Sequence, residues 1–245
     1  VLYDATHNQF LFSKNADTQY YPASITKLMT ALLAMENAAP DQNVVVTREA
    51  ILVEGSALGL REGDLALTYI GRLAQEKSIG ELLRFLPDTP QNVRLLLVGD
   101  GPYREKLEAQ VRELGIAGRV IFSGMAAPER VADYYKVGDI FVSASRSETQ
   151  GLTYIEAMAS GLPLLCRKDD CLSGVLLPEV NGFAYTTEAE FLAGLSALSD
   201  AQTRRDMGAA AQSAAYARFS AESFTRKVLQ VYQDCLPRSK EASAA

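Results

Sequence analysis

Several residue types are scarce in this sequence, and each scarcity excludes some classes of protein or functional site. The 245 residues include one histidine, no tryptophan and three cysteines, Cys166, Cys171 and Cys235. An odd number of cysteines without zinc-like spacing argues against a disulfide framework and indicates a reducing compartment. The histidine, His7, falls in a short polar stretch typical of a hairpin turn. We therefore interpret it as a solvated turn residue and not as a catalytic one.

Positive charge and long apolar runs are scarce too. Lysine and arginine number 24 against 30 aspartates and glutamates, a net charge of -6, so no basic stripe is available for nucleic acid. No apolar run approaches the roughly 18 to 20 residues that span a bilayer, and we recognise no secretory signal. Residue 1 is valine, which predicts a fragment or a processed form. We expect no nucleic-acid partner, no transmembrane segment and a cytoplasmic location.

What the sequence does contain is the composition of a globular protein, with 48% hydrophobic and 22% charged residues. Residues 1–22 alternate as in a β-hairpin, and the apolar spacing from Ser24 onward predicts a helix. After Tyr69, short apolar strands alternate with helical stretches of about ten to fifteen residues, the pattern of βαβ units. This predicts an α/β fold: a Rossmann-like parallel sheet with helices on both faces, preceded by a small hairpin-plus-helix segment.

The change of pattern predicts a junction near Thr68–Tyr69. The expected domains are residues 1–68, residues 69–236 and a flexible tail at 237–245. A lone hairpin is marginal in water and an apolar helix needs a partner surface. We therefore expect the first segment either to pack on the second or to mediate self-association.

The first segment contains the pattern S-x-x-K in "YPASITKLMTALL", formed by Ser24 and Lys27. Side chains three residues apart on a helix share a face, so the lysine amine can approach the serine hydroxyl and accept its proton. Together with the hairpin and "VTREAILVEGSALGLREGD", this stretch resembles the D-alanyl-D-alanine carboxypeptidases, a penicillin-binding family. The resemblance implies acylation of Ser24, with Lys27 as the base. The S-x-N and K-T-G elements that such enzymes also need do not follow Lys27.

The second segment carries two glutamates eight apart, Glu148 and Glu156, in "SETQGLTYIEAMASGLPLL". Between them Gly151 lies where a strand leads into a helix, and the free amides of a helix start can hold phosphate oxygens. Glu156, inside the helix, is placed to accept hydrogen bonds from sugar hydroxyls. Arg72 and Lys77 follow an earlier strand and share the carboxyl edge of the sheet, where ligands of open parallel sheets bind. Both cations suit a diphosphate.

The order and spacing of "YIGRLAQEKSI", "LLLVGDGPYREKLEAQVRELGI", "RVIFSGMAAPERVADYYKVGDIFVSAS" and the E-x7-E stretch resemble the C-terminal, donor-binding domain of family 4 glycosyltransferases of the GT-B type, over about Tyr69 to Cys235. The resemblance implies catalytic roles for Arg72, Lys77 and Glu148, with the cations stabilising the leaving diphosphate electrostatically. The implied donor-binding residues are Arg72, Lys77, Phe122, Met125, Glu148, Gly151, Leu152, Thr153 and Glu156. Retention of configuration, no obligatory metal or other cofactor, and a nucleotide-sugar donor are further implications of the family.

A narrower resemblance is to bacterial transferases that glucosylate diacylglycerol-type lipids, which favours UDP-glucose as donor and a lipid or glycan as acceptor. With such an acceptor, the protein could attach to the inner face of the membrane. The family that residues 1–68 resemble is instead extracytoplasmic. GT-B enzymes bind the acceptor in a second, N-terminal domain, which residues 1–68 do not resemble. Three hypotheses follow: a glycosyltransferase donor domain, a serine carboxypeptidase fragment acylated at Ser24, and a non-catalytic chimera.

Overall fold

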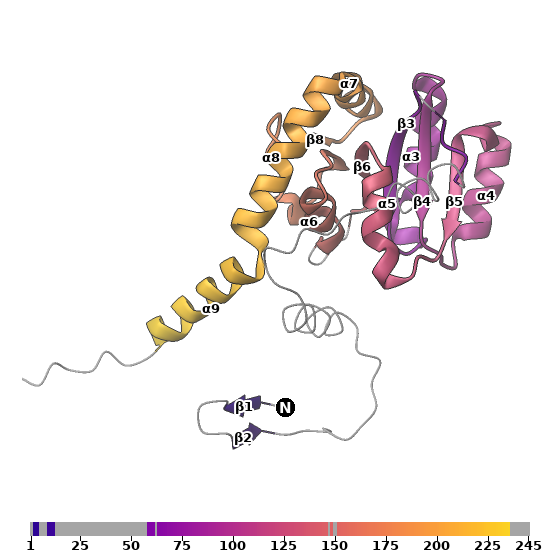
Figure 1. Ribbon diagram of the computed structural model, residues 1–245. Helices are drawn as coiled ribbons and strands as arrows, with labels where there is room; N and C mark the ends of the chain where they lie inside the picture. Colours follow the sequence, from indigo (N-terminus) through magenta and orange to yellow (C-terminus); the bar gives the residue numbers. More distant parts are fainter. Residues whose placement is uncertain are drawn as a thin grey trace, which may run out of the picture. The chain divides into compact units, whose positions relative to one another are not determined.

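The computed structural model describes residues 2–4, 9–12, 58–61, 63–146, 148 and 151–235 (Figure 1). The chain divides into two units, Val1–Val46 and Thr47–Ala245. In the first, strands β1 (Leu2–Asp4) and β2 (Gln9–Phe12) pair antiparallel, which confirms the predicted hairpin. The predicted turn at His7 and the predicted helix with Ser24 and Lys27 lie outside the described residues.

The second unit contains a six-stranded sheet in which all neighbouring strands are parallel. Its order is β5-β4-β3-β6-β7-β8, so β3 and β6 are central and the chain runs outward from them in both directions. This is the doubly wound arrangement, and it confirms the predicted α/β fold. The strands are β3 (Leu65–Ile70), β4 (Val93–Val98), β5 (Val120–Gly124), β6 (Ile140–Ser143), β7 (Leu164–Arg167) and β8 (Gly182–Tyr185).

Helices cover both faces of this sheet, as predicted. The helices described in this unit are α3 (Ile79–Phe85), α4 (Arg104–Glu113), α5 (Val131–Val137), α6 (Leu152–Ala159), α7 (Glu188–Ser199), α8 (Ala201–Phe219) and α9 (Ala221–Cys235). Five 3₁₀ turns join them: η1 (Gln75–Lys77), η2 (Leu86–Asp88), η3 (Ala117–Arg119), η4 (Pro128–Arg130) and η5 (Asp170–Leu172). No helix within the described ranges is both long and apolar enough to cross a membrane.

The pleat of the strands divides the core into two layers. On β3, Leu65, Leu67 and Tyr69 pack with apolar residues of α3, α4 and α7. Ile70 faces the opposite way and packs with residues of α5, α6 and α8. All six residues of β3 are buried, as expected for a parallel strand covered on both faces.

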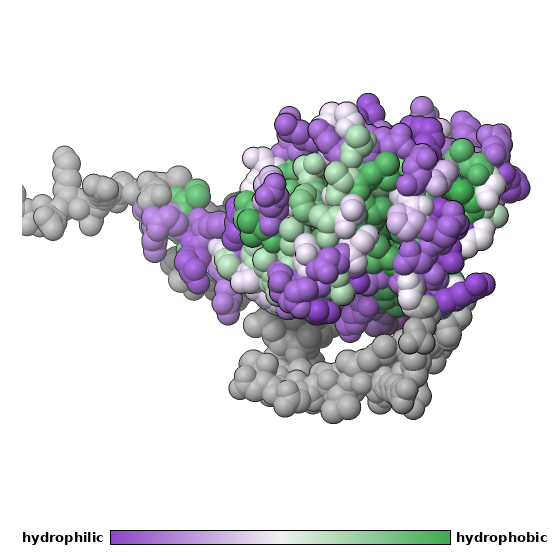
Figure 2. Space-filling model, turned by 90° about the horizontal axis from the view of Figure 1, so that it is seen from above, coloured by the Kyte–Doolittle hydropathy of each residue, from purple (hydrophilic) through white to green (hydrophobic). Residues whose placement is uncertain are grey.

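Seen from above, hydrophobic residues occupy the middle of the visible face and hydrophilic ones border it (Figure 2).

Strand β3 runs without interruption through Thr68–Tyr69, where the sequence pattern changes. Thr68 pairs with Leu96 of β4 and with Phe141 of β6, so this position lies at the centre of the sheet. The residues before β3 also contact the domain: the Asp64 carboxylate lies 3.1 Å from the Arg94 guanidinium. The side chains on either side of the predicted junction therefore belong to one packed strand.

Strand β8 was not predicted. It is four residues long and begins at Gly182, where an added Cβ would lie 2.1 Å from the Leu164 carbonyl oxygen of β7. Phe183 and Tyr185 favour a strand, but a glycine at the start and a length of four residues leave the segment without a clear strand pattern. Its pairing with β7 is therefore a property of the assembled sheet.

Candidate functional site

The turns that follow β3 and β4 are joined at the carboxyl edge of the sheet. The Gly71 amide donates to the Val98 carbonyl at 2.9 Å, and the Leu73 amide donates to the Asp100 carbonyl at 2.9 Å. At Gly99 (φ +130°), a Cβ would lie 2.0 Å from the Gly71 carbonyl oxygen, so only glycine fits there. The turn after β4 therefore supports the loop that carries Arg72 and Lys77.

The loops that follow β3 and β6 meet through Lys77 and Glu148. The Lys77 ammonium donates to a Glu148 carboxylate oxygen at 2.5 Å, although the two residues are 71 positions apart. Only 20% of the lysine side chain and 17% of the glutamate side chain are exposed. Because β3 and β6 are neighbours whose connections run in opposite directions, this contact lies at the topological switch point, where doubly wound sheets bind ligands.

Arg72 lies five residues before Lys77 and is more exposed. Its guanidinium forms an ion pair with Glu76. The Tyr69 hydroxyl donates to the Arg72 carbonyl at 3.0 Å, which fixes the backbone of this loop. Burial raises the pKa of Tyr69, and the nearby charges of Glu148 and Glu76 raise it further, so the phenol stays neutral and remains a donor.

Helix α6 begins directly after Gly151, as the sequence predicts. Gly151 adopts a left-handed conformation (φ +58°), and a Cβ there would lie 2.7 Å from the Tyr154 ring. Glycine therefore permits the tight turn that brings the amides of Leu152 and Thr153 to the helix start. The first amides of a helix have no helical acceptor, so they are available to an anion.

Glu156 lies one turn further into α6, where its carboxylate contacts α5. The Tyr135 hydroxyl donates to Glu156 Oε2 at 3.0 Å and lies 3.2 Å from the Thr153 carbonyl oxygen. Burial raises the pKa of Tyr135, and the charge of Glu156 raises it further. Sequence reasoning missed Tyr135, because its spacing in "VADYYKV" is that of any core-facing helix residue.

Phe122 and Met125 lie at the other end of the carboxyl edge, on and after β5. The Phe122 ring is half-buried beside the core, with the Arg104 guanidinium 5.7 Å from its centroid. Met125 is 79% exposed. Strand β5 lies three strand spacings from β6, about 14 Å. The predicted donor-binding residues therefore extend along the edge from β5 to β6.

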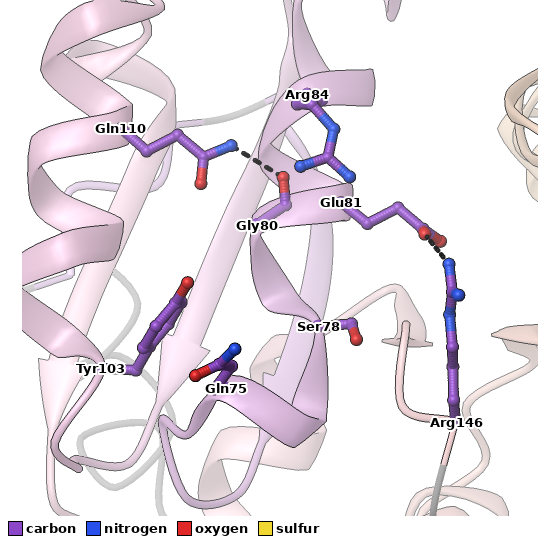
Figure 3. Close-up of a pocket in the computed structure, with 8 residues that line it drawn as sticks. All are labelled: Gln75, Ser78, Gly80, Glu81, Arg84, Tyr103, Gln110 and Arg146. Atoms are coloured by element: carbon purple, nitrogen blue, oxygen red, sulfur yellow. Dashed lines mark hydrogen bonds and ion pairs between the residues drawn. The ribbon is translucent and has the colours of Figure 1, made fainter.

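A polar pocket of about 310 Å³ is lined by residues on both sides of Lys77 in the sequence, and none of its lining residues was predicted as a site residue (Figure 3). The Gln110 amide closes one side by donating to the Gly80 carbonyl at 2.8 Å. Glu81 and Arg146 form an ion pair on the other side. The lining residues are Gln75, Ser78, Gly80, Glu81, Arg84, Tyr103, Gln110 and Arg146. Arg146 stands only two residues before Glu148, so the pocket adjoins the loop that carries this glutamate.

The described residues include no group of three or more histidine, cysteine, aspartate or glutamate side chains placed to hold a metal ion. The charged contacts at the carboxyl edge include those of Lys77 with Glu148 and of Arg72 with Glu76. Such a set recognises an anion and hydroxyl groups.

The doubly wound sheet with helices on both faces defines a Rossmann-like α/β domain. Residues 54–214 match the family described as "Glycosyl transferases group 1", and the chain belongs to this family. Residues 1–69 match the family described as "D-alanyl-D-alanine carboxypeptidase". Both resemblances recognised in the sequence are thereby confirmed, and the two matches overlap at residues 54–69. Ser24 and Lys27 lie outside the described residues, so their predicted roles stay predictions.

Two relatives carry the same name, "Alpha-monoglucosyldiacylglycerol synthase". The protein from Streptococcus pneumoniae is 38% identical over 184 residues, which cover 74% of this chain and 41% of that protein. The protein from Acholeplasma laidlawii is 31% identical over 160 residues, which cover 64% of this chain and 40% of that protein. This chain therefore spans less than half the length of either relative.

Among solved structures, the chain is similar to Anabaena Alr3699/HepE in complex with UDP. The TM-score is 0.70 with 25% sequence identity, and the match covers 77% of this chain and 54% of that chain. The same protein in complex with UDP-glucose matches with a TM-score of 0.69 at 23% identity, covering 77% of this chain and 54% of that one, and supports the fold alone.

Proposed function

We propose that this glycosyltransferase-family chain binds a nucleotide sugar, with UDP-glucose favoured, along the carboxyl edge of its sheet. The observation that carries the proposal is the Lys77–Glu148 contact at the switch point between β3 and β6. It brings a cation suited to a diphosphate beside a carboxylate suited to sugar hydroxyls. The UDP bound to the Anabaena protein and the glucosyl group named in the two synthases support this donor.

In the proposed complex, Arg72 and Lys77 bind the diphosphate. Two cations at this position would stabilise the charge that develops on the leaving diphosphate as the glycosidic bond breaks. This electrostatic role requires no metal. The amides of Gly151, Leu152 and Thr153 would hold the distal phosphate at the start of α6.

Two glutamates would orient the sugars. Glu148 would accept hydrogen bonds from the transferred sugar, and Glu156 from the ribose hydroxyls, with Tyr135 holding the Glu156 carboxylate in place. The segment from Phe122 to Met125 would line the base. The donor would then extend along the edge from β5 to β6.

The proposed reaction is retaining transfer of the sugar to a lipid or glycan acceptor. We distinguish donor binding from turnover, because the proposed donor contacts all lie in the glycosyltransferase-family unit and residues 1–69 match a different family. We expect this chain to bind the donor and to need an acceptor-binding half for transfer. A diacylglycerol-type acceptor would bring the protein to the cytoplasmic surface of a membrane.

Calorimetric titration with UDP and UDP-glucose tests the proposal. A half-site should bind with Kd on the order of 0.1–1 mM, roughly 4 to 5.5 kcal/mol. Arg72→Ala and Glu156→Ala should each lose measurable binding, since one charge-assisted contact contributes about 1.5–3 kcal/mol. Arg112→Ala and Glu113→Ala, at exposed positions of α4, are the matched controls. Wild-type protein that binds no nucleotide sugar would contradict the proposal.

The match of residues 1–69 favours a second candidate function, acyl transfer at Ser24. A fluorescent penicillin should then label the chain covalently, and Ser24→Ala should abolish the label while leaving UDP binding unchanged. A chain that neither binds nucleotide sugars nor reacts with penicillin would leave the hypothesis of a non-catalytic chimera.

A further inference from the structure

Glu81 is a buried carboxylate shared by two arginines from different parts of the chain. It lies in the first turn of α3 and is 6% exposed. Arg146, in the loop after β6, approaches Glu81 Oε2 at 3.1 Å (Figure 3). Arg167, at the end of β7, approaches Glu81 Oε1 at 2.6 Å. Each carboxylate oxygen is therefore paired with one guanidinium.

These ion pairs lie beside the proposed donor contacts. Lys77 precedes Glu81 by four residues, and Arg146 precedes Glu148 by two. The loops after β3 and β6 are thus joined twice, once by Lys77 with Glu148 and once by Glu81 with Arg146. The second connection holds Arg146, which stands two positions before the residue proposed to contact the sugar.

Arg167 anchors Glu81 to the sheet. Its guanidinium lies 6.0 Å from the centroid of the Tyr185 ring, and the Tyr185 hydroxyl donates to the Ser143 carbonyl of β6 at 3.2 Å. Arg167 is only 15% exposed, whereas the Arg146 side chain is 60% exposed. Of the two arginines that share Glu81, Arg146 is therefore the one that can move into water when the carboxylate is lost.

We propose that Glu81 is a positioning residue for the donor site, which holds the loop after β6 so that Glu148 meets the transferred sugar. The inference rests on the proposed function and assigns Glu81 no contact with the donor. Replacing Glu81 with glutamine leaves two guanidinium groups facing each other without a shared counter-charge. The loop is then released on the Arg146 side. The sugar contact is weakened while the diphosphate and ribose contacts remain.

The test compares the Kd for UDP-glucose with the Kd for UDP in the full chain. Glu81→Gln should raise the Kd for UDP-glucose at least fivefold and leave the Kd for UDP within twofold. Arg146→Gln, which changes an exposed side chain, should have the same effect on the two Kd values. The double variant should lose no more affinity for UDP-glucose than either single variant. In a Glu148→Gln background, Glu81→Gln should have no further effect. Glu113→Gln is the matched control for loss of an exposed carboxylate.

A role in folding alone would lower the thermal stability of Glu81→Gln without changing the ratio of the two Kd values, and would overturn the inference. If Glu81→Gln does not fold, the ratio of the Kd for UDP-glucose to the Kd for UDP in Arg146→Gln tests the inference instead. Equal affinities of the wild type for UDP and UDP-glucose would overturn the inference but leave donor binding intact. Wild-type protein that binds neither ligand would overturn the inference together with the proposed function.

Discussion

The ammonium group of Lys77 and the carboxylate of Glu148 lie 2.5 Å apart in a chain where 71 positions separate them. Each side chain is about four-fifths buried, so the pair sits in a partly desolvated setting where either charge alone would be unfavourable. A nucleotide sugar would meet both groups at once, its diphosphate at the lysine and its sugar at the glutamate. This pairing links the order of the strands to the proposed chemistry.

Replacing Lys77 with methionine should weaken UDP-glucose binding by about 10- to 150-fold. The lost charge-assisted contact contributes about 1.5–3 kcal/mol, and Glu148 is left without its counter-charge. Calorimetric titration measures the change, with Lys136→Met on α5 as the matched control, since that side chain is 56% exposed. Unchanged affinity in Lys77→Met would remove this lysine from the donor site.

Replacing Gly151 with alanine should raise the Kd for UDP at least tenfold. The Cβ would lie 2.7 Å from the Tyr154 ring, and because this ring is buried we expect the start of α6 and its amides to shift. Gly115→Ala is the matched control, because Gly115 also has a left-handed conformation (φ +66°) and no atom within 4 Å of an added Cβ. Both variants carry about 1–2 kcal/mol of backbone strain, and only Gly151→Ala should change nucleotide affinity. Equal nucleotide affinities in the two variants would contradict a phosphate-binding role for this turn.

Stability should depend on pH through Asp64. Burial works to raise the pKa of this carboxyl group, but hydrogen bonds from the Arg61 amide and the Arg94 guanidinium hold it below the usual value of 3.8. Ionised Asp64 therefore stabilises the fold at pH values above 3.8, and this contribution is lost as the pH falls through the lower, folded-state pKa. Asp64→Asn should lower the Tm by roughly 3–6 °C at pH 7. The difference from wild type should shrink towards pH 3, and a difference independent of pH would contradict the ion pair with Arg94.

Truncation should show that the folded glycosyltransferase unit begins before residue 65. A chain of residues 58–235 keeps all of β3, together with Asp64 and its contact with Arg94. A chain of residues 69–235 loses Leu65–Thr68, and with them most of the ladders to β4 and β6. We expect cooperative thermal unfolding by circular dichroism for the first and none for the second. Cooperative unfolding of the shorter chain would instead support a boundary at Thr68–Tyr69.

Much of the fold could be predicted because its signals are local. Five of the six parallel strands are short apolar runs, and helical stretches between them fixed the fold class. Strand β8 was missed because it is only four residues long and begins with a glycine, so its apolar pattern is too short to indicate a strand. The hairpin was predicted from the alternation of residues 1–22, and the antiparallel pairing of β1 with β2 confirms it.

The sequence likewise indicates some residues of the candidate site and not others. Arg72, Lys77 and Glu148 stand at strand-to-helix junctions. Glu156 lies inside the helix that begins after Gly151. The sequence therefore indicates all four as candidate ligand-binding residues. Tyr135 and Glu81 have the spacing of ordinary helix residues, and nothing local distinguishes them. Their partners, Glu156 for Tyr135 and Arg146 for Glu81, come from other elements.

By itself the sequence determined the two family resemblances, the α/β class and the residue types at the carboxyl edge. Only the tertiary structure decided which charges meet. Glu81 pairs with residues 65 and 86 positions away, and Lys77 with one 71 positions away. The physical reason is that apolar periodicity and turn propensity act over a few neighbouring residues. Ion pairs between loops depend instead on the order of the strands, which places β6 and β7 beside β3 only when the whole sheet is assembled.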